Sequence, residues 1–220
     1  MKISVVAAAI GIFSAAAAIA APPPVVSHSP QVAVSVARID GRDAVRIEHN
    51  NDQNAAWGVA ATGIEMRDGV IEVEVKSELS PAAPEGSRGF VGIAFRTQPD
   101  LVTYEAMYVR PTNGRAEEQI RRNRSTQYVS HPQYPWYRLR QEAPGQYESY
   151  VDLEIGVWTR LRIEVSGTRA RLYVNNAAQP ALVVNDLRHG AERGGGVALW
   201  IGSGTIAHFA NLTVRPRTSS

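Results

Sequence analysis

Residues 156–175 read GVWTRLRIEVSGTRARLYVN and predict a β-hairpin with one buried face. Apolar side chains stand at every second position, Leu161, Ile163 and Val165 in the first half and Ala170, Leu172 and Val174 in the second. Ser166-Gly167 supplies the turn between the two halves. Because side chains of a strand alternate between its faces, each half presents one apolar face to a core.

The same alternation recurs along the chain, for example at Ile71, Val73 and Val75. The apolar runs 90–95 and 197–201 are typical of strands that are covered on both faces. No window gives a convincing amphipathic helix, and residues 116–124 are expected to form a short turn at most. We therefore predict an all-β fold, an antiparallel two-sheet jelly-roll sandwich with one long loop region rich in arginine and aromatic residues.

The N-terminus predicts an export signal over residues 1–20. Lys2 is followed by an apolar, alanine-rich run, and Ala18-Ile19-Ala20 is a cleavage site of the A-x-A type. A membrane anchor is the competing interpretation, but the run is short and ends in small residues and prolines. We expect a proline-rich leader over residues 21–30, the sandwich domain over 31–216, a disordered tail over 217–220, no membrane span after signal removal, and a periplasmic or secreted bacterial protein.

Composition narrows the classes of partner. The chain has no cysteine, so its stability after export must come from packing. Its formal charge of +2 falls to +1 when Lys2 leaves with the signal, which disfavours a nucleic-acid partner. The basic residues are instead concentrated between Arg110 and Arg140.

Two later segments share their pattern with a known group of folds. Residues 194–202 read GGGVALWIG and residues 207–214 read AHFANLTV. Together with the hairpin 156–175, they resemble the closing strands of the concanavalin A-like (laminin G-like) lectin and glucanase jelly-roll superfamily, over about the last third of the chain. DUF1080-type domains linked to 3-keto-glycoside hydrolysis are similar too. The resemblance implies a fold that hosts lectins, glycosidases, lyases and adhesion modules.

The segment between residues 95 and 152 carries the candidate binding residues. Aromatic rings suit the apolar face of a sugar, and guanidinium groups suit hydroxyls or carboxylates. The predicted ligand-binding residues are Arg96, Tyr104, Tyr108, Arg110, Asn113, Arg115, Arg121, Asn123, Tyr128, His131, Trp136, Tyr137 and Arg138.

Alternation places Tyr104, Ala106, Tyr108 and Arg110 on one strand face, which the resemblance implies is the concave, sugar-binding face. The alternative is that both tyrosines pack under a loop and Arg110 pairs with a carboxylate.

Residues 111–133 are too long and too charged for a simple hairpin connection, and long loops in compact domains are often binding loops. Arginines such as Arg115 and Arg121 can bind carboxylate, sulfate or phosphate. The alternative is that they pair locally with Glu117 and Glu118. Two prolines stiffen the following segment, where Trp136 can stack on a sugar or close one end of the sandwich.

Catalysis has only weak candidates. His131 can serve as a general base, and His131 or Tyr128 can act together with a carboxylate such as Glu105 or Glu117. The chain lacks the Glu-x-Asp-x-x-Glu strand of retaining concanavalin A-like glucanases, and Glu72-Val-Glu74 is the nearest approach to it. No motif of a serine hydrolase, nucleotide binder or zinc protease is present. We expect no metal and no cofactor; structural calcium is left open because several lectins of this shape carry it, although no acidic loop site is present.

These observations predict an exported carbohydrate-binding β-sandwich protein that recognises a polar, acidic or modified glycan on its concave face. The alternatives are a glycan-cleaving enzyme, either a hydrolase or a lyase, and a structural or adhesive envelope domain. An enzyme requires an acid and a base that converge on one pocket.

Overall fold

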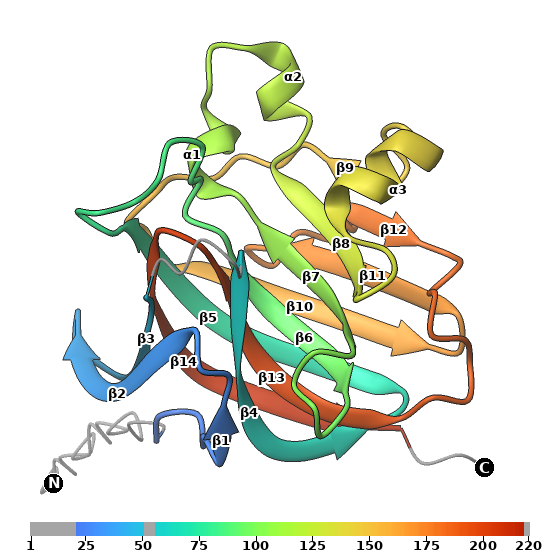
Figure 1. The fold of residues 1–220 in the computed structure, drawn as a ribbon, viewed down its shortest axis with the longest axis horizontal. Coiled ribbons are helices and arrows are strands. Elements are labelled where there is room, and N and C mark those ends of the chain that lie inside the picture. Colours follow the sequence, from blue (N-terminus) through green and yellow to red (C-terminus); the bar gives the residue numbers. More distant parts are fainter. Residues whose placement is uncertain (1–20, 51–55, 218–220) are drawn as a thin grey trace, which may run out of the picture.

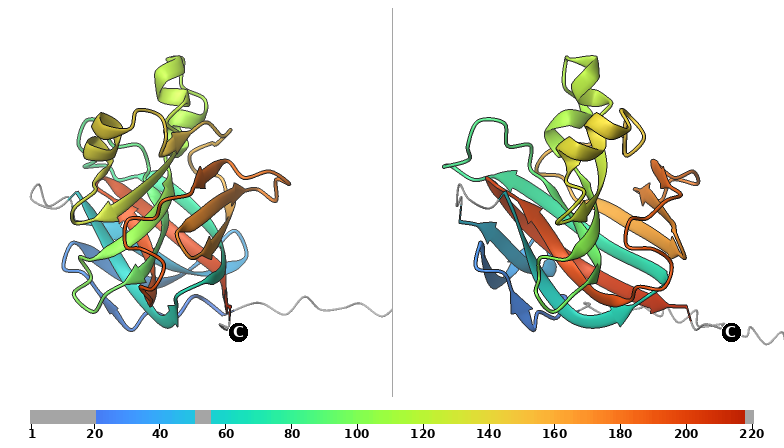
Figure 2. Two further views of the ribbon diagram at one scale, coloured as in Figure 1. Left: turned by 90° about the vertical axis from the view of Figure 1, so that its right-hand side faces the viewer. Right: turned by 45° about the vertical axis from the view of Figure 1, so that its right-hand side comes forward.

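The computed structural model describes residues 21–50 and 56–217, which form two antiparallel sheets of seven strands each, packed face to face (Figures 1 and 2). This confirms the predicted two-sheet sandwich. In spatial order, sheet A contains β1 (Ser27–His28), β4 (Trp57–Met66), β13 (Gly195–Gly202), β6 (Val91–Thr97), β7 (Tyr104–Val109), β8 (Thr126–His131) and β9 (Glu148–Ser149). Sheet B contains β12 (Leu182–Val184), β11 (Arg169–Val174), β10 (Thr159–Ser166), β5 (Gly69–Leu79), β14 (Thr205–Pro216), β3 (Arg42–His49) and β2 (Val32–Ile39).

The hairpin read from residues 156–175 is formed by β10 and β11. Leu161 lies opposite Val174 and Ile163 opposite Leu172, so the apolar faces of the two strands coincide. A slip by one residue would turn these side chains to solvent, and the alternation therefore fixes the register.

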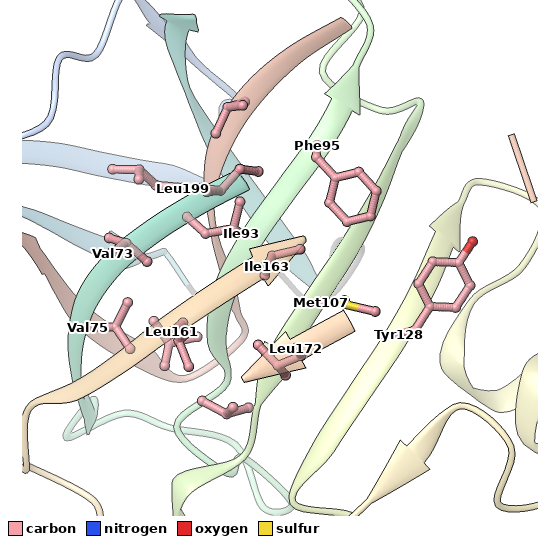
Figure 3. Close-up of a cluster of buried hydrophobic side chains, with 14 of the residues drawn as sticks. Val73, Val75, Ile93, Phe95, Met107, Tyr128, Leu161, Ile163, Leu172 and Leu199 are labelled. Atoms are coloured by element: carbon pink, nitrogen blue, oxygen red, sulfur yellow. The ribbon is translucent and has the colours of Figure 1, made fainter. Parts of the chain in front are cut away.

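The main core lies between the sheets. Figure 3 shows Ile93, Phe95 and Met107 of sheet A pointing toward Leu161 and Ile163 of sheet B. All five are almost fully buried. Each such side chain contributes about 1.5–3 kcal/mol through burial, so this layer supplies most of the driving force for the sandwich.

Three short helices interrupt the strands: α1 (Pro111–Gly114), α2 (Gln119–Arg122) and α3 (Trp136–Glu142). They gather at the end of sheet A where β7 ends and β8 begins (Figure 1). α2 lies within the stretch expected to form a short turn, whereas α3 was not predicted. Only Leu139 of α3 is buried, so the sequence of this helix lacks the repeating apolar positions by which an amphipathic helix is recognised.

The structure describes only some of the segments that contain the predicted domain boundaries. The predicted signal, residues 1–20, lies outside the described residues, as does most of the predicted tail. Within the predicted leader, Ser27 and His28 form β1 and pair with β4. In the described part of the chain, no helix has the length and apolar character needed to cross a bilayer.

Leu199 in β13 is fully buried in the main core. We expect Leu199→Ala to lower the free energy of unfolding by about 2–5 kcal/mol, because it removes packing atoms and leaves a cavity. Urea denaturation measures the change. Val183→Ala, at a position that is 40% exposed, is the control and should change stability by less than about 0.5 kcal/mol. Equal effects at both positions would contradict this account of the core.

Candidate functional site

Strand β7 divides its side chains between two faces of sheet A. Met107 and Val109 pack in the core shared with sheet B. Tyr104, Ala106 and Tyr108 belong instead to a second cluster, all of whose buried members come from sheet A. This second cluster defines what we call the outer face, the side of sheet A that points away from sheet B.

The centre of the outer face is an aromatic cluster. The rings of Tyr108 and Trp200 stack with centroids 4.3 Å apart. They do so on either side of Gly92, where an added Cβ would lie 2.5 Å from the Cβ of Tyr108. The indole Nε1 of Trp200 donates a hydrogen bond to the Tyr104 hydroxyl, at 3.1 Å. Glycine is therefore required at position 92 because the backbone of β7 and the Cβ of Tyr108 fill that space.

This cluster closes the middle of the face. Tyr104, Tyr108 and Trp200 are at most 3% exposed, and burial raises the pKa of both tyrosines above the ordinary value. The rings of both tyrosines are packed, and Arg110 pairs with a carboxylate, as the alternative interpretation of this strand proposed. A cavity opens at each end of the Tyr104–Arg110 row.

At the Arg110 end is a cavity of about 250 Å³. The loop before β6, the insert between β7 and β8 (residues 110–125, with α1 and α2) and α3 all contribute to its wall. We call it the arginine pocket, and it is lined by Gly86, Arg88, Phe90, Arg110, Asn113, Arg121, Arg124, Trp136 and Arg140. The insert and the sheet thus build one site together, at the end of the outer face.

Glu148 of β9 anchors three of these arginines. Its carboxylate accepts hydrogen bonds from Arg140 and, at 3.4 Å, from Nη1 of Arg110, and it lies 3.5 Å from Nε of Arg124. Arg110 also donates to the Tyr108 hydroxyl at 3.0 Å and to the Gln127 amide oxygen at 2.9 Å. A buried guanidinium needs such full satisfaction, because an unpaired buried charge is costly.

The pocket carries an excess of positive charge. Five guanidinium groups line it, and two carboxylates pair with them, Glu148 and the exposed Glu118 that accepts from Arg121 at 3.2 Å. Burial, and then repulsion from Arg121, lowers the pKa of Arg88 below its ordinary value. This arrangement favours a bound anion.

At the Tyr104 end is a larger cavity of about 510 Å³, lined among others by His28, Gln31, Trp57, Leu101 and Tyr104. His131 contacts this end from within the sheet, with its ring centroid 4.1 Å from that of Trp57. Burial lowers the pKa of His131 to about 4, so its ring is neutral at pH 7.

Two predicted ligand residues point into the sandwich. Arg96 is fully buried, and it donates to Glu105 at 3.2 Å and to the carbonyl oxygens of Gly167 and Gly190 at 2.7 Å. Tyr128 is equally buried and donates to Glu105 at 2.6 Å. Both side chains connect sheet A to loops on the other side of the sandwich, and neither lies on the outer face.

Other predicted residues lie on the surface outside both cavities. Arg115 pairs with Asp152 at 3.0 Å, and Arg138 pairs with Glu142 at 2.6 Å. Asn123 is exposed and accepts a hydrogen bond from Gln119. Tyr137 is 59% exposed and its ring packs edge-on against Trp136. Of the thirteen predicted residues, the arginine pocket brings together Arg110, Asn113, Arg121 and Trp136.

The weak catalytic candidates do not converge. Glu105 faces the interior of the sandwich, whereas His131 faces the aromatic cluster on the other side of sheet A. Glu117 is exposed on the insert. Within the described part of the chain, no three His, Asp or Glu side chains gather in a way that could hold a metal ion.

Comparison with known proteins rests on structure alone, since no family model and no curated protein matches the chain. The carbohydrate-binding module CBM66 from Bacillus subtilis is similar, with a TM-score of 0.56, 12% identity, and coverage of 84% of this chain and 95% of that one. So is the VIP36 exoplasmic/lumenal domain in its Ca²⁺/Man3GlcNAc-bound form, with a TM-score of 0.54, 11% identity, and coverage of 92% and 89%.

A Bacillus subtilis protein of unknown function with a galectin-like fold also matches, with a TM-score of 0.50, 12% identity, and coverage of 88% and 98%. The fold is that of the concanavalin A-like jelly rolls. At such low sequence identity, the structural similarity establishes the fold of this chain. It does not establish the role of any residue.

Arg88, Phe90 and Arg140 line the arginine pocket but were not among the residues predicted from the sequence. Strand pairing offers a signal for the first two, because Val91 lies opposite Val109 and the residues that precede Val91 must therefore lie near Arg110. Arg140 falls within the basic stretch noted in the sequence, but its place depends on α3.

Glu148→Gln tests the anchoring of the arginines. The substitution removes the carboxylate that neutralises buried Arg110, and we expect the free energy of unfolding to fall by about 3–5 kcal/mol. Chemical denaturation measures it. Glu142→Gln, which breaks an exposed pair with Arg138, is the control and should cost less than about 1 kcal/mol. A Glu148→Gln protein as stable as the wild type would contradict the anchoring role.

His131 predicts a pH dependence of stability. The unfolded chain takes up a proton near pH 6.5 and the folded protein only near pH 4, so the free energy of unfolding falls as the pH decreases between these values. The loss amounts to about 3 kcal/mol at most. His131→Gln should flatten the slope of stability against pH in this window, whereas the same change at exposed His28 should leave it as it is.

Proposed function

We propose that this jelly roll binds carbohydrate, and that it recognises a polar or acidic glycan at the arginine pocket. One observation carries the proposal: guanidinium groups, an amide and the rings of Trp136 and Phe90 line one cavity at the end of the outer face. A sugar presents hydroxyls, an apolar ring face and, in acidic glycans, an anionic group, and this wall offers a partner for each.

The names of two structural neighbours support the proposal in general terms. One is a carbohydrate-binding module, and the other was crystallised with Man3GlcNAc. The aromatic cluster changes the expected mode of binding, since its closed centre leaves the ligand to bind at the end of the face.

A glycan-cleaving enzyme receives less support, because His131 and Glu105 lie on opposite faces of sheet A. An adhesive domain would present a contiguous apolar surface. Ile120 and Tyr137 are exposed near the pocket, but charged Arg121 and Arg138 stand beside them. The mixture of rings and charges suits a glycan better than an apolar protein surface.

Export to the periplasm or beyond is part of the proposal, and it rests on the N-terminal sequence. The expected mature protein begins at Ala21, after the Ala18-Ile19-Ala20 site. N-terminal sequencing of the protein recovered from outside the cytoplasm checks this expectation.

The binding test is a glycan array that includes neutral and acidic glycans, followed by titration of the best ligand. Trp136→Ala should weaken that ligand about tenfold, because a ring that stacks on a sugar is a typical hot spot. Trp158→Ala is a matched control: both indoles lie under an arginine, Trp136 under Arg140 at 4.6 Å and Trp158 under Arg42 at 4.9 Å. Trp158 is outside the pocket, so its loss should leave affinity unchanged. Silence on every glycan would overturn the proposed function.

A further inference from the structure

The five arginines of the pocket fall into two groups. Arg110, Arg124 and Arg140 contact Glu148 and are held in place by it. Arg88 and Arg121 do not contact Glu148, and they approach the cavity from the loop before β6 and from α2. The first group is already neutralised in part by a buried carboxylate. The second group has the donors that remain for a ligand.

Within the part of the chain that the structure describes, Arg88 has no carboxylate partner. The only hydrogen bond of its guanidinium among the described residues runs from Nη1 to the carbonyl oxygen of Ser87, at 2.8 Å, and the guanidinium forms no ion pair there. The lowered pKa of Arg88 comes first from burial and then from Arg121. Two guanidinium groups that repel each other across a cavity gain free energy when an anion binds between them.

Arg121 is only partly satisfied. Its Nη1 donates to Glu118 at 3.2 Å, and that carboxylate is 62% exposed at the rim. Its Nε is buried and has no hydrogen-bond partner in the described part of the chain. A buried donor without a partner is costly, so an acceptor oxygen supplied by a ligand at this position is favoured.

Asn113 adds an acceptor to these donors. Its Nδ2 donates to the carbonyl oxygen of Arg124 at 3.1 Å, which fixes the orientation of the amide. Its Oδ1 is buried and has no partner among the described residues. This amide oxygen can only accept a hydrogen bond, so it cannot bind an anion that has no hydrogen to donate. It can bind a ligand hydroxyl group next to the anionic group.

We infer that Arg88 and Arg121 form an oxyanion subsite and that Asn113 accepts a hydrogen bond from an adjacent hydroxyl of the same ligand. The ligand class is a hydroxylated oxyanion, a sugar residue that carries a carboxylate, sulfate or phosphate group. The inference rests on the proposed function and deepens it. Arg110, Arg124 and Arg140 form the wall, and Glu148 is the positioning residue that holds them.

The first test uses inorganic sulfate and phosphate, titrated calorimetrically at low ionic strength against the mature protein. We expect saturable binding at one site. Arg88→Gln and Arg121→Gln should each weaken it about 10- to 100-fold, the range for a lost charge-assisted hydrogen bond. Arg115→Gln is the matched control, since it removes one charge from the same insert at a residue that pairs with Asp152 outside the pocket. It should change the affinity by less than about twofold.

The second test separates the sources of the anionic group and examines Asn113. Glucuronate, glucose 6-phosphate and glucose 6-sulfate are compared with neutral glucose, and glycolate is compared with acetate. The wild type should prefer each charged sugar to glucose and glycolate to acetate. Asn113→Ala should remove the preference for glycolate, since only the hydroxyl distinguishes the two acids, and thermal unfolding confirms that each variant is folded.

The outcomes separate this inference from the proposed function. Absence of saturable oxyanion binding, or equal weakening by Arg115→Gln and Arg121→Gln, overturns the subsite. Neutral glycans that bind as well as acidic ones, with no effect of Arg121→Gln, overturn the subsite and leave carbohydrate binding in place. Oxyanions that bind at Arg88 and Arg121 while no sugar binds support the anion site and overturn the glycan proposal.

Discussion

The carboxylate of Glu148 is the constraint around which the candidate site is organised. It lies on the short edge strand β9, and through three guanidinium groups it connects the end of β7, the insert and α3. Neither α2 nor α3 has enough apolar surface to fix its own position: α2 has no buried residue and α3 has one. A charge network takes over the role that apolar packing has in the sandwich, and this network produces a cavity lined by donors rather than a closed core.

The outer face of sheet A has been filled at its centre. A flat aromatic surface on a sheet is a natural place for a sugar, but here Tyr108 and Trp200 stack on each other over Gly92 and exclude a ligand. A ligand can therefore reach the outer face at the two ends of the Tyr104–Arg110 row, where the two cavities lie. Trp57 lines the cavity at one end, with neutral His131 packed against it, and the arginines surround the other cavity, so the two cavities differ sharply in charge.

Much of the fold could be predicted from sequence because alternation is local information. Leu161, Ile163 and Val165 mark the inner face of β10 without reference to any other segment, and the matching period of β11 sets the register. The division of β7 into an outer set with Tyr104 and an inner set with Met107 follows from the same rule. α3 was not predicted because Leu139 is its only buried residue, and a single apolar position does not produce a helical repeat in the sequence.

The sequence by itself determined which residue types the site would contain, since arginines and rings gather between Arg110 and Arg140. The tertiary structure decided which of them face a ligand. Arg96 and Arg110 look alike in sequence, yet a buried Glu105 binds the first inside the sandwich, and Glu148, thirty-eight residues away along the chain, binds the second at the pocket. The interaction between two charges depends on their distance in space, and alternation along a strand does not show which distant residue will be close.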